Sequence, residues 1–366
     1  MSFTAGDARH MARALHLAAR ALYTTDPNPR VGCVIVKDDQ ILGEGWHVRA
    51  GEPHAEVLAL REAGERARGA DVYVTLEPCN HHGRTPPCTD ALRRAGVGRV
   101  FAAMRDPNPL VDGKGFERLR AAGIECRDGL LQAEAEALNP GFISRMRRGR
   151  PYVRLKVAAS LDGRTAMANG ESQWITGEAA RLDVQRLRAR SSAILTGIET
   201  VLADDPALTV RAFDIGRQPL RVVVDSRLRL PAGARMLRLP GATLVATTSS
   251  DPARSNALRA AGADVLQLPA VAARVDLRAL LERLAERQVN EVLVEAGPVL
   301  SGALLAERLI DELILYLAPA LLGDTARGML HLPALRSLKD RVQLHITDVR
   351  AVGADWKISA KPEAET

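Results

Sequence analysis

Two short segments of this chain carry side chains that must meet at one point, and this requirement constrains the fold more than any other feature. The first segment is Pro-His-Ala-Glu, with His54 and Glu56, and the second begins with Pro-Cys at Cys79 and ends at Cys88. One imidazole and two thiolates are ligands that zinc prefers, and three protein ligands leave a fourth position for water. The fold must therefore bring residues 54, 79 and 88 together.

The same pattern indicates a chemistry. A His-x-Glu motif followed by Pro-Cys and a second cysteine is typical of zinc-dependent nucleobase deaminases. Zinc lowers the pKa of the water that it binds to about 7, and a carboxylate two residues after the histidine can carry that proton to the leaving amine. We therefore predict His54, Cys79 and Cys88 as metal ligands and Glu56 as the catalytic proton carrier.

The spacer between the two cysteines departs from the deaminase pattern. It has eight residues, 80–87, where that pattern has two, and it contains His81 and His82. One alternative is therefore a structural zinc site that either histidine closes as a fourth ligand. A coincidental gathering of unrelated residues is a second alternative.

Length and periodicity predict two α/β domains, because 366 residues are too many for one ordinary core. We place the boundary before Pro151, giving domains 1–148 and 149–366. The first half alternates helices and strands as a three-layer arrangement does. Its expected elements are helices at 7–24, 53–67, 89–95 and 115–122, a helical segment within 130–150, and strands at 31–36, 40–46, 71–76, 97–104 and 124–127. Those of the second half are strands at 152–159, 193–197, 220–225, 242–247, 265–268, 291–295 and 311–318, helices at 177–191, 275–288 and 300–307, and a C-terminal antiparallel pair at 343–350 and 355–360.

The second half also contains a candidate anion site. The sequence has no Gly-x-Gly-x-x-Gly fingerprint. Instead a strand at 291–295 runs through Ala296 and Gly297 directly into a helix, whose free N–H groups can bind an anion, and Ser301 can add a hydroxyl. The alternative is a plain strand-to-helix connection without a ligand.

Several motifs together resemble one family. The segments Pro-Asn-Pro-Arg-Val-Gly (27–32), Glu-Pro-Cys-Asn-His-His-Gly-Arg-Thr-Pro-Pro-Cys (77–88) and Asp-Pro-Asn-Pro-Leu-Val (106–111) are similar to the deaminase half of the bifunctional riboflavin-biosynthesis deaminase/reductases, the RibD family. The segments 156–163, 172–176 and 197–206 resemble its reductase half. The resemblance covers about residues 7–355. It implies an N-terminal cytidine-deaminase-like α/β/α domain and a C-terminal dihydrofolate-reductase-like α/β domain that uses NADPH.

The resemblance also implies binding residues. In the deaminase half, Asn28, His47 and Arg84 would contact the pyrimidine nucleotide and its phosphate, although Asn28 can equally be a turn residue and Arg84 a solvated loop charge. In the reductase half, the residues expected to face the cofactor are Ala158, Trp174, Thr200, Asp204, Ser226, Gly297, Pro298, Val299, Leu300, Ser301, Gly302 and Ala303. Those expected to face the substrate are Lys156, Ser172, Arg188, Leu208, Arg211 and Glu295.

Two further positions bear on the reductase half. Asp162 would lie with Lys156 near its reaction centre. Ala296 stands where the family usually has a glycine, and its methyl group is expected to crowd the cofactor phosphate. For single residues, a role without any ligand remains an alternative: Trp174 can be ordinary core and Arg188 a solvated helix charge.

These features predict a two-step enzyme of riboflavin synthesis. A zinc-dependent deamination of 2,5-diamino-6-(phosphoribosylamino)pyrimidinone would precede an NADPH-dependent reduction of the ribosyl group to ribityl. One alternative is a tRNA or nucleoside deaminase with a degenerate second domain. Another is a zinc-stabilised binding protein without catalysis.

Composition limits the partners. The net charge is +6 and aromatic residues make up 3% of the chain, so the basic stripe with stacking aromatics that nucleic acid needs is not expected. The dense run at Arg147, Arg148 and Arg150 suits a solvated linker or attraction to phosphorylated substrates. The sequence contains no stretch of about 18 apolar residues, so no membrane span is predicted.

Cysteine usage and family resemblance give two last expectations. Two of the four cysteines fall in the metal motif, which leaves no obvious disulfide framework and suits a reducing cytoplasm. A homo-oligomer, with a dimer favoured, is expected from related reductases.

Overall fold

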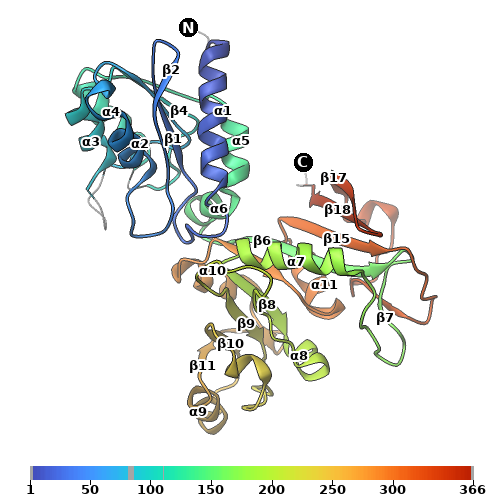
Figure 1. The fold of residues 1–366 in the computed structure, drawn as a ribbon. Coiled ribbons are helices and arrows are strands. Elements are labelled where there is room, and N and C mark those ends of the chain that lie inside the picture. Colours follow the sequence, from blue (N-terminus) through green and yellow to red (C-terminus); the bar gives the residue numbers. More distant parts are fainter. Residues whose placement is uncertain (1–2, 81–85, 110, 364–366) are drawn as a thin grey trace. The chain divides into compact units, whose positions relative to one another are not determined.

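The computed structural model describes residues 3–80, 86–109 and 111–363 (Figure 1). The chain divides into two compact units, Met1–Gly149 and Arg150–Thr366, whereas the predicted boundary follows residue 148. Among the described residues, no helix combines the length and apolar character needed to cross a membrane.

The first unit is built on a five-stranded sheet in the order β2-β1-β3-β4-β5. Strand β1 is antiparallel to β2 and β3, whereas β3, β4 and β5 are parallel. The strands are β1 Gly32–Lys37, β2 Gln40–Trp46, β3 Asp71–Val74, β4 Arg99–Ala102 and β5 Glu125–Asp128. The helices are α1 Ala5–Ala19, α2 Ala55–Ala63, α3 Cys88–Ala95, α4 Lys114–Ala121, α5 Gln132–Leu138 and α6 Pro140–Arg148, and a short 3-10 turn, Gly64–Ala67, follows α2.

Helices cover both faces of this sheet, as the alternation of its buried residues requires. Along β1, Cys33 and Ile35 pack with α2, α3 and α4, whereas Val34 and Val36 pack with α1, α5 and α6. The two helical layers lie on opposite sides of the sheet in Figure 1. Gly32 permits the close approach of α1, because a Cβ there would lie 2.0 Å from the carbonyl oxygen of Ala14. The result is the three-layer α/β/α arrangement that the sequence predicts.

The second unit is built on a nine-stranded mixed sheet in the order β11-β10-β9-β8-β14-β6-β15-β18-β17. The seven strands from β11 to β15 in this order are parallel, and β18 and β17 add an antiparallel hairpin. The strands are β6 Tyr152–Ser160, β8 Ala193–Gly197, β9 Leu220–Val224, β10 Thr243–Thr247, β11 Ala263–Gln267, β14 Glu291–Val294, β15 Glu312–Ala318, β17 Leu344–Val352 and β18 Asp355–Pro362. Short two-stranded pairs, β7 Arg164–Ala166 with β16 Arg327–Gly328 and β12 Ala270–Val271 with β13 Arg274–Val275, lie outside the main sheet.

Within the described residues of this unit, five α-helices flank the sheet. They are α7 Glu178–Arg190, α8 Ile198–Asp204, α9 Pro252–Ala260, α10 Leu277–Glu286 and α11 Pro298–Ala306. Helices α10 and α11 pack on the face that carries Leu195 and Val222, and α7, α8 and α9 pack on the face that carries Ile194 and Val223. The unit is therefore also a layered α/β fold, and β8, β9 and β14 all end at one edge of it.

Three α-helices differ from expectation. Helix α1 ends at Ala19 rather than at residue 24, because the next residues form turns and Thr24 donates its hydroxyl to the Val48 carbonyl at 2.6 Å. Helices α8 and α9 lie where no helix is expected from the sequence.

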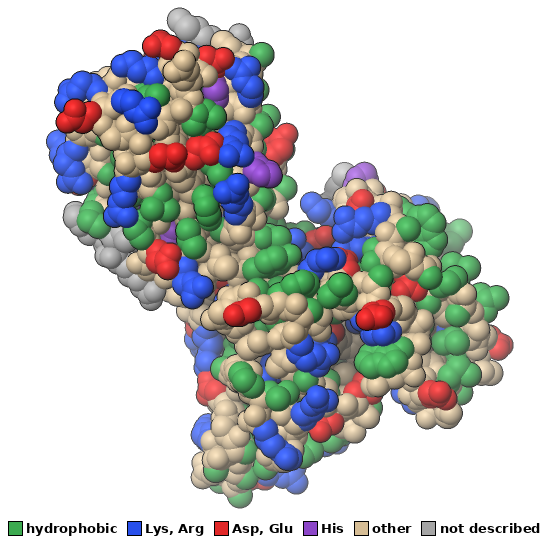
Figure 2. Space-filling view, in the orientation of Figure 1, with side chains coloured by type: hydrophobic (Ala, Val, Ile, Leu, Met, Phe, Trp, Pro, Cys, Tyr) green, Lys and Arg blue, Asp and Glu red, His purple; other side chains and the backbone are tan. Residues whose placement is uncertain are grey.

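Basic and acidic side chains are interspersed on the visible face of each unit in Figure 2, without a continuous basic stripe there.

Candidate active sites

The first site is a cluster of three metal-binding side chains in the first unit. His54 is the N-cap residue of α2, Cys88 is the first residue of α3, and Cys79 lies in the loop after β3. The Nδ1 atom of His54 lies 3.2 Å from the sulfur of Cys88 and 3.5 Å from that of Cys79. All three ligand atoms lie within 4.8 Å of one another, so this donor set fits a zinc ion, and the N-termini of both helices add positive potential there.

The protonation states in this cluster follow from its burial and hydrogen bonds. A hydrogen bond with Cys88, opposed by burial and assisted by His54, lowers the pKa of Cys79 to about 4. The backbone N–H of Cys88 also donates to the Cys79 sulfur at 3.3 Å. Glu56 is only 3% exposed, and burial raises its pKa although His54 opposes the shift. A carboxyl whose proton affinity is increased in this way suits a group that must both accept and release a proton.

Asn28 and His47, predicted as substrate residues, lie beside the metal cluster. The Nδ2 atom of Asn28 is 3.0 Å from Nε2 of His47, and Nδ1 of the same ring is 3.2 Å from the carbonyl oxygen of Pro53. Because a carbonyl oxygen only accepts, Nδ1 carries the proton and Nε2 accepts from the Asn28 amide. Burial lowers the pKa of His47, which agrees with this neutral form. Its ring centroid lies 5.2 Å from that of His54.

Other predicted residues of this half are outside the described part of the chain. Arg84, predicted at the substrate phosphate, lies there, as do His81 and His82, which the alternative of a four-ligand zinc site requires. The open site and the four-ligand alternative therefore both stay predictions.

Glu77 is a residue of this site that was not predicted to matter. Its buried carboxylate accepts four backbone N–H groups, at 3.0 to 3.3 Å, from Asp106, Gly113, Gly115 and Phe116. It thereby ties the start of α4 to the strand end that carries Cys79. The signal in the sequence is a charged residue directly before Pro78-Cys79, but its partners, about 30 to 40 residues away, are found only in the fold.

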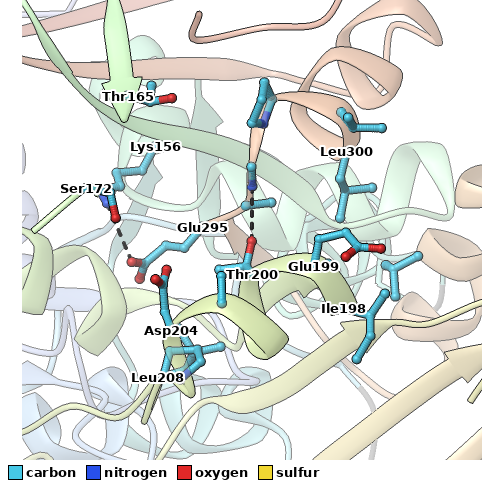
Figure 3. Close-up of a pocket in the computed structure, with 18 of the residues that line it drawn as sticks. Lys156, Thr165, Ser172, Ile198, Glu199, Thr200, Asp204, Leu208, Glu295 and Leu300 are labelled. Carbon is cyan, nitrogen blue, oxygen red and sulfur yellow. Dashed lines mark hydrogen bonds and ion pairs between the residues drawn. The ribbon is translucent and has the colours of Figure 1, made fainter. Parts of the chain in front are cut away.

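The second site is a cleft of about 1980 Å³ in the second unit. It lies where β8, β9 and β14 end, which is where open parallel sheets bind ligands. Of the residues predicted from the sequence, those that line it are Lys156, Ala158, Ser172, Trp174, Arg188, Thr200, Asp204, Leu208, Arg211, Ser226, Glu295, Gly297, Pro298, Val299, Leu300 and Ala303. Side chains from β6, α8 and α11, together with Glu295 directly after β14, point into one hollow in Figure 3.

A buried carboxylate forms the centre of one part of this cleft. Glu295 receives two hydrogen bonds from Arg188, at 2.6 and 2.9 Å, and Lys156 Nζ lies 3.6 Å from it. Burial alone would raise the pKa of Glu295, but Arg188 and then Lys156 outweigh burial and hold the pKa at about 2. Arg188 is therefore no solvated helix charge, and a fixed negative group faces the cleft between two cations.

The opposite part of the cleft is shaped by the start of α11. Gly297 caps this nine-residue helix, and its N–H donates to Thr200 Oγ1 at 3.2 Å (Figure 3). Ser226 follows β9 and accepts the N–H of Val275 at 3.2 Å. Trp174 is 70% exposed, so it is not ordinary core, and the Arg181 guanidinium lies 4.9 Å from its ring centroid.

Three positions lie away from this lining. Ser301 is fully buried and donates to the Ala296 carbonyl at 3.3 Å. Gly302 faces the other side of α11, where a Cβ would lie 2.0 Å from the carbonyl oxygen of His331. Asp162 accepts N–H groups from Leu322 and Gly323 in an exposed loop. An uninterrupted run of seven residues cannot all face one cleft, because successive helical residues point about 100° apart.

Ala296 does line the cleft, and it is half-buried against the core beside α11. Its methyl group thus has a packing partner in the protein. The predicted crowding of a cofactor phosphate stays a prediction.

Comparison with known proteins agrees with this division. The family model of the cytidine and deoxycytidylate deaminase zinc-binding region matches residues 5–104, and that of the RibD C-terminal domain matches residues 151–358. The chain is 55% identical over 362 residues to the riboflavin biosynthesis protein RibD of Escherichia coli (strain K12), covering 95% of this chain and 97% of that protein. It is 48% identical to RibD of Haemophilus influenzae, covering 99% of both.

Solved structures show the same fold. The chain is similar to Acinetobacter baumannii RibD, with a TM-score of 0.91 and 49% identity over 98% of this chain and 99% of that one. It is also similar to the Thermotoga maritima diaminohydroxyphosphoribosylaminopyrimidine deaminase/5-amino-6-(5-phosphoribosylamino)uracil reductase, with a TM-score of 0.86 and 33% identity over 98% and 99% of the two chains.

Proposed function

We propose a role for each site on an established premise: this chain belongs to the RibD family of bifunctional deaminase/reductases of riboflavin biosynthesis. The chain is therefore both a hydrolase and an oxidoreductase. Its first unit, Met1–Gly149, contains the zinc-binding deaminase motif, and its second unit, Arg150–Thr366, contains the reductase domain. The roles of individual residues, and the substrates, are our assignment.

We assign the metal cluster to the deamination of a diaminohydroxyphosphoribosylaminopyrimidine. His54, Cys79 and Cys88 would hold the zinc ion, and a zinc ion bound there would activate a water molecule. Glu56 carries a proton from this water to the departing amine, since it is buried next to the cluster. Asn28 and the neutral His47 orient the pyrimidine, because their polar edges meet beside His54. Arg84, in the adjoining spacer, is proposed to bind the phosphate.

We assign the cleft of the second unit to the reduction of the deaminated nucleotide. NADPH supplies the hydride. We assign NADPH binding to Thr200, Ser226 and the start of α11, where the helix N-terminus and its backbone N–H groups favour a phosphate. Arg188, Lys156 and Glu295 line the other part of the cleft and are assigned to the ribosyl substrate, because they present fixed charges and hydrogen-bonding groups there.

The observation that carries this proposal is the gathering of two separate sets of predicted residues, one around a three-ligand cluster and the other around one cleft. The test is a coupled assay: ammonia release from the diamino nucleotide, then NADPH oxidation with the deaminated product. We expect both. A zinc-loaded, folded protein that releases ammonia but never oxidises NADPH would support the rival, a nucleoside or tRNA deaminase with a degenerate second domain.

We also propose that the enzyme is a homodimer. Strand β17 is the edge of the nine-stranded sheet, and nearly all its side chains are exposed. In an antiparallel pairing of two copies about Val349, Asp348 of one copy would face Arg350 of the other, which suits an isologous interface. Analytical ultracentrifugation is expected to give twice the chain mass, and a monomer at micromolar concentration would contradict the proposal.

A cytoplasmic location is proposed from the cysteines. Cys79 and Cys88 must stay unoxidised to hold a metal, and Cys33 and Cys126 are free, buried cysteines. A reducing compartment keeps cysteines in this reduced form. Fractionation of cells with an antibody against the chain would test this location.

A further inference from the structure

A buried polar cluster behind the reductase cleft is used by none of the roles above. Asp183 of α7 accepts hydrogen bonds from Tyr316 of β15 at 2.6 Å and from Lys357 of β18 at 2.7 Å. All three residues are at most 8% exposed. Burying a carboxylate and an ammonium is costly unless the two are paired and hydrogen-bonded, so the cluster fixes Asp183, and with it α7, against the sheet.

A second contact joins the same hairpin to the start of α7. Asp355, only 2% exposed, accepts the backbone N–H of Gly177 at 2.7 Å, and Gly177 is the N-cap residue of the helix. The carboxylate thus satisfies one of the free N–H groups of the first turn and lies at its positive end. In the hairpin turn, Gly353 has a φ of +65°, and a Cβ there would lie 2.8 Å from the Cβ of Ala179. The hairpin therefore touches α7 at several points of its length.

The other face of α7 organises the part of the cleft assigned to the substrate. Arg181, Gln185 and Arg188 follow helical spacing and lie on one face. Arg181 donates to the Thr176 carbonyl at 2.8 Å, and the Gln185 side chain accepts the N–H of Arg211 at 2.9 Å. Arg188 holds Glu295. Any rotation or shift of α7 would move all three of these contacts at once.

We propose that Asp355 and Lys357 of the C-terminal hairpin are positioning residues of the reductase: they fix α7 so that its opposite face holds the substrate part of the cleft. The inference rests on the proposed function of that part. It also gives the last residues of the sheet a role in the second reaction, although none of them lines the cleft.

The test separates binding of the nucleotide from binding of NADPH. We expect Asp355→Ala and Lys357→Met to raise the KM for the nucleotide on the order of tenfold, because small displacements of positioning groups have effects of this size or larger. The KM for NADPH should stay within about twofold, since Thr200 and Gly297 lie on other elements. Ammonia release by the same preparation, from the other unit, normalises the amount of folded enzyme.

Matched variants make the outcome decisive. Asp355→Asn keeps an oxygen that can accept from Gly177 and should restore most of the nucleotide affinity. Lys361→Met alters an exposed lysine of the same strand and should leave both KM values unchanged. If either main variant does not fold, Tyr316→Phe, which removes only the second donor to Asp183, supplies the same test in milder form.

Two results would overturn the inference. One is an unchanged nucleotide KM in folded Asp355→Ala and Lys357→Met. The other is an equal rise in both KM values with a lower melting temperature, which indicates general loosening. Arg188→Ala is measured in parallel: if it leaves reduction intact, the assigned substrate part itself is wrong, whereas impairment by Arg188→Ala alone refutes only the role of the hairpin.

Discussion

Replacing Arg188 with alanine would leave a carboxylate buried without its main partner. Glu295 is 10% exposed and receives both of its short hydrogen bonds from Arg188. In the absence of Arg188, Lys156, 3.6 Å away, is the one cation among the described residues that is paired with Glu295 and opposes the effect of burial. We expect the pKa of Glu295 to rise and the protein to lose stability at neutral pH.

The magnitude follows from the pKa of Glu295. A fall from 4.5 to about 2 corresponds to about 3 kcal/mol in favour of the folded, ionised state. Because the folded-state pKa is lowered, this contribution is present above pH 4.5 and is lost as the pH falls towards 2. Arg188→Ala should therefore destabilise the second unit by about 3 kcal/mol at pH 7, as breaking other buried pairs does, and the deficit should shrink on acidification.

Urea unfolding followed by tryptophan fluorescence measures this effect, since Trp174 and Trp356 both lie in the second unit. Adding Glu295→Gln to Arg188→Ala should recover part of the stability, because it removes the unpaired charge, while reduction of the nucleotide stays impaired. An unfolding midpoint at pH 7 equal to that of the parent protein, or a deficit that is no smaller at about pH 3 than at pH 7, would refute the reasoning.

Three further substitutions test other parts of the account. Glu56→Gln should keep the zinc and the fold but slow ammonia release by at least about a hundredfold; normal release with full metal content would remove the assigned role. Glu77→Ala leaves four N–H groups without their acceptor and should lower the stability of the first unit by about 1–3 kcal/mol, seen as an earlier thermal transition, whereas an unchanged transition would show that water replaces the carboxylate. Thr200→Val deprives Gly297 of its hydrogen bond and should raise the KM for NADPH several-fold without altering that for the nucleotide; equal effects on both would contradict the division of the cleft.

Local sequence patterns predicted most elements of both sheets. The strand at 291–295 and the helix after Gly297 are found as β14 and α11, and the C-terminal pair is found as β17 and β18. These elements carry strong local signals: apolar periodicity, a proline in the first turn of a helix, and a turn between strands. Helix α9 carries such a signal too, since Asp251 accepts the N–H groups of Ala253 and Arg254 next to Pro252, and it could have been predicted from this cap.

The contacts between distant segments could not be predicted in the same way. Glu77, Asp183 and Lys357 form hydrogen bonds with residues far along the chain, and no local sequence pattern specifies such partners. The motif did predict that His54, Cys79 and Cys88 lie together, because the ligands of one metal ion must surround it. The direction in which a residue of a helix points was harder to infer. Ser301 and Gly302 belong to a motif whose neighbours line the cleft, yet their positions around α11 turn both away from it.

The coordination of the metal in the active enzyme tests the central claim most directly. Metal analysis combined with X-ray absorption at the zinc edge would count the ions and their ligands. We predict one zinc per chain, bound by two sulfur atoms and one imidazole nitrogen, with a light-atom ligand in the remaining position. A zinc ion enclosed by four side chains, or an enzyme that releases ammonia at full rate without any metal, would contradict the account.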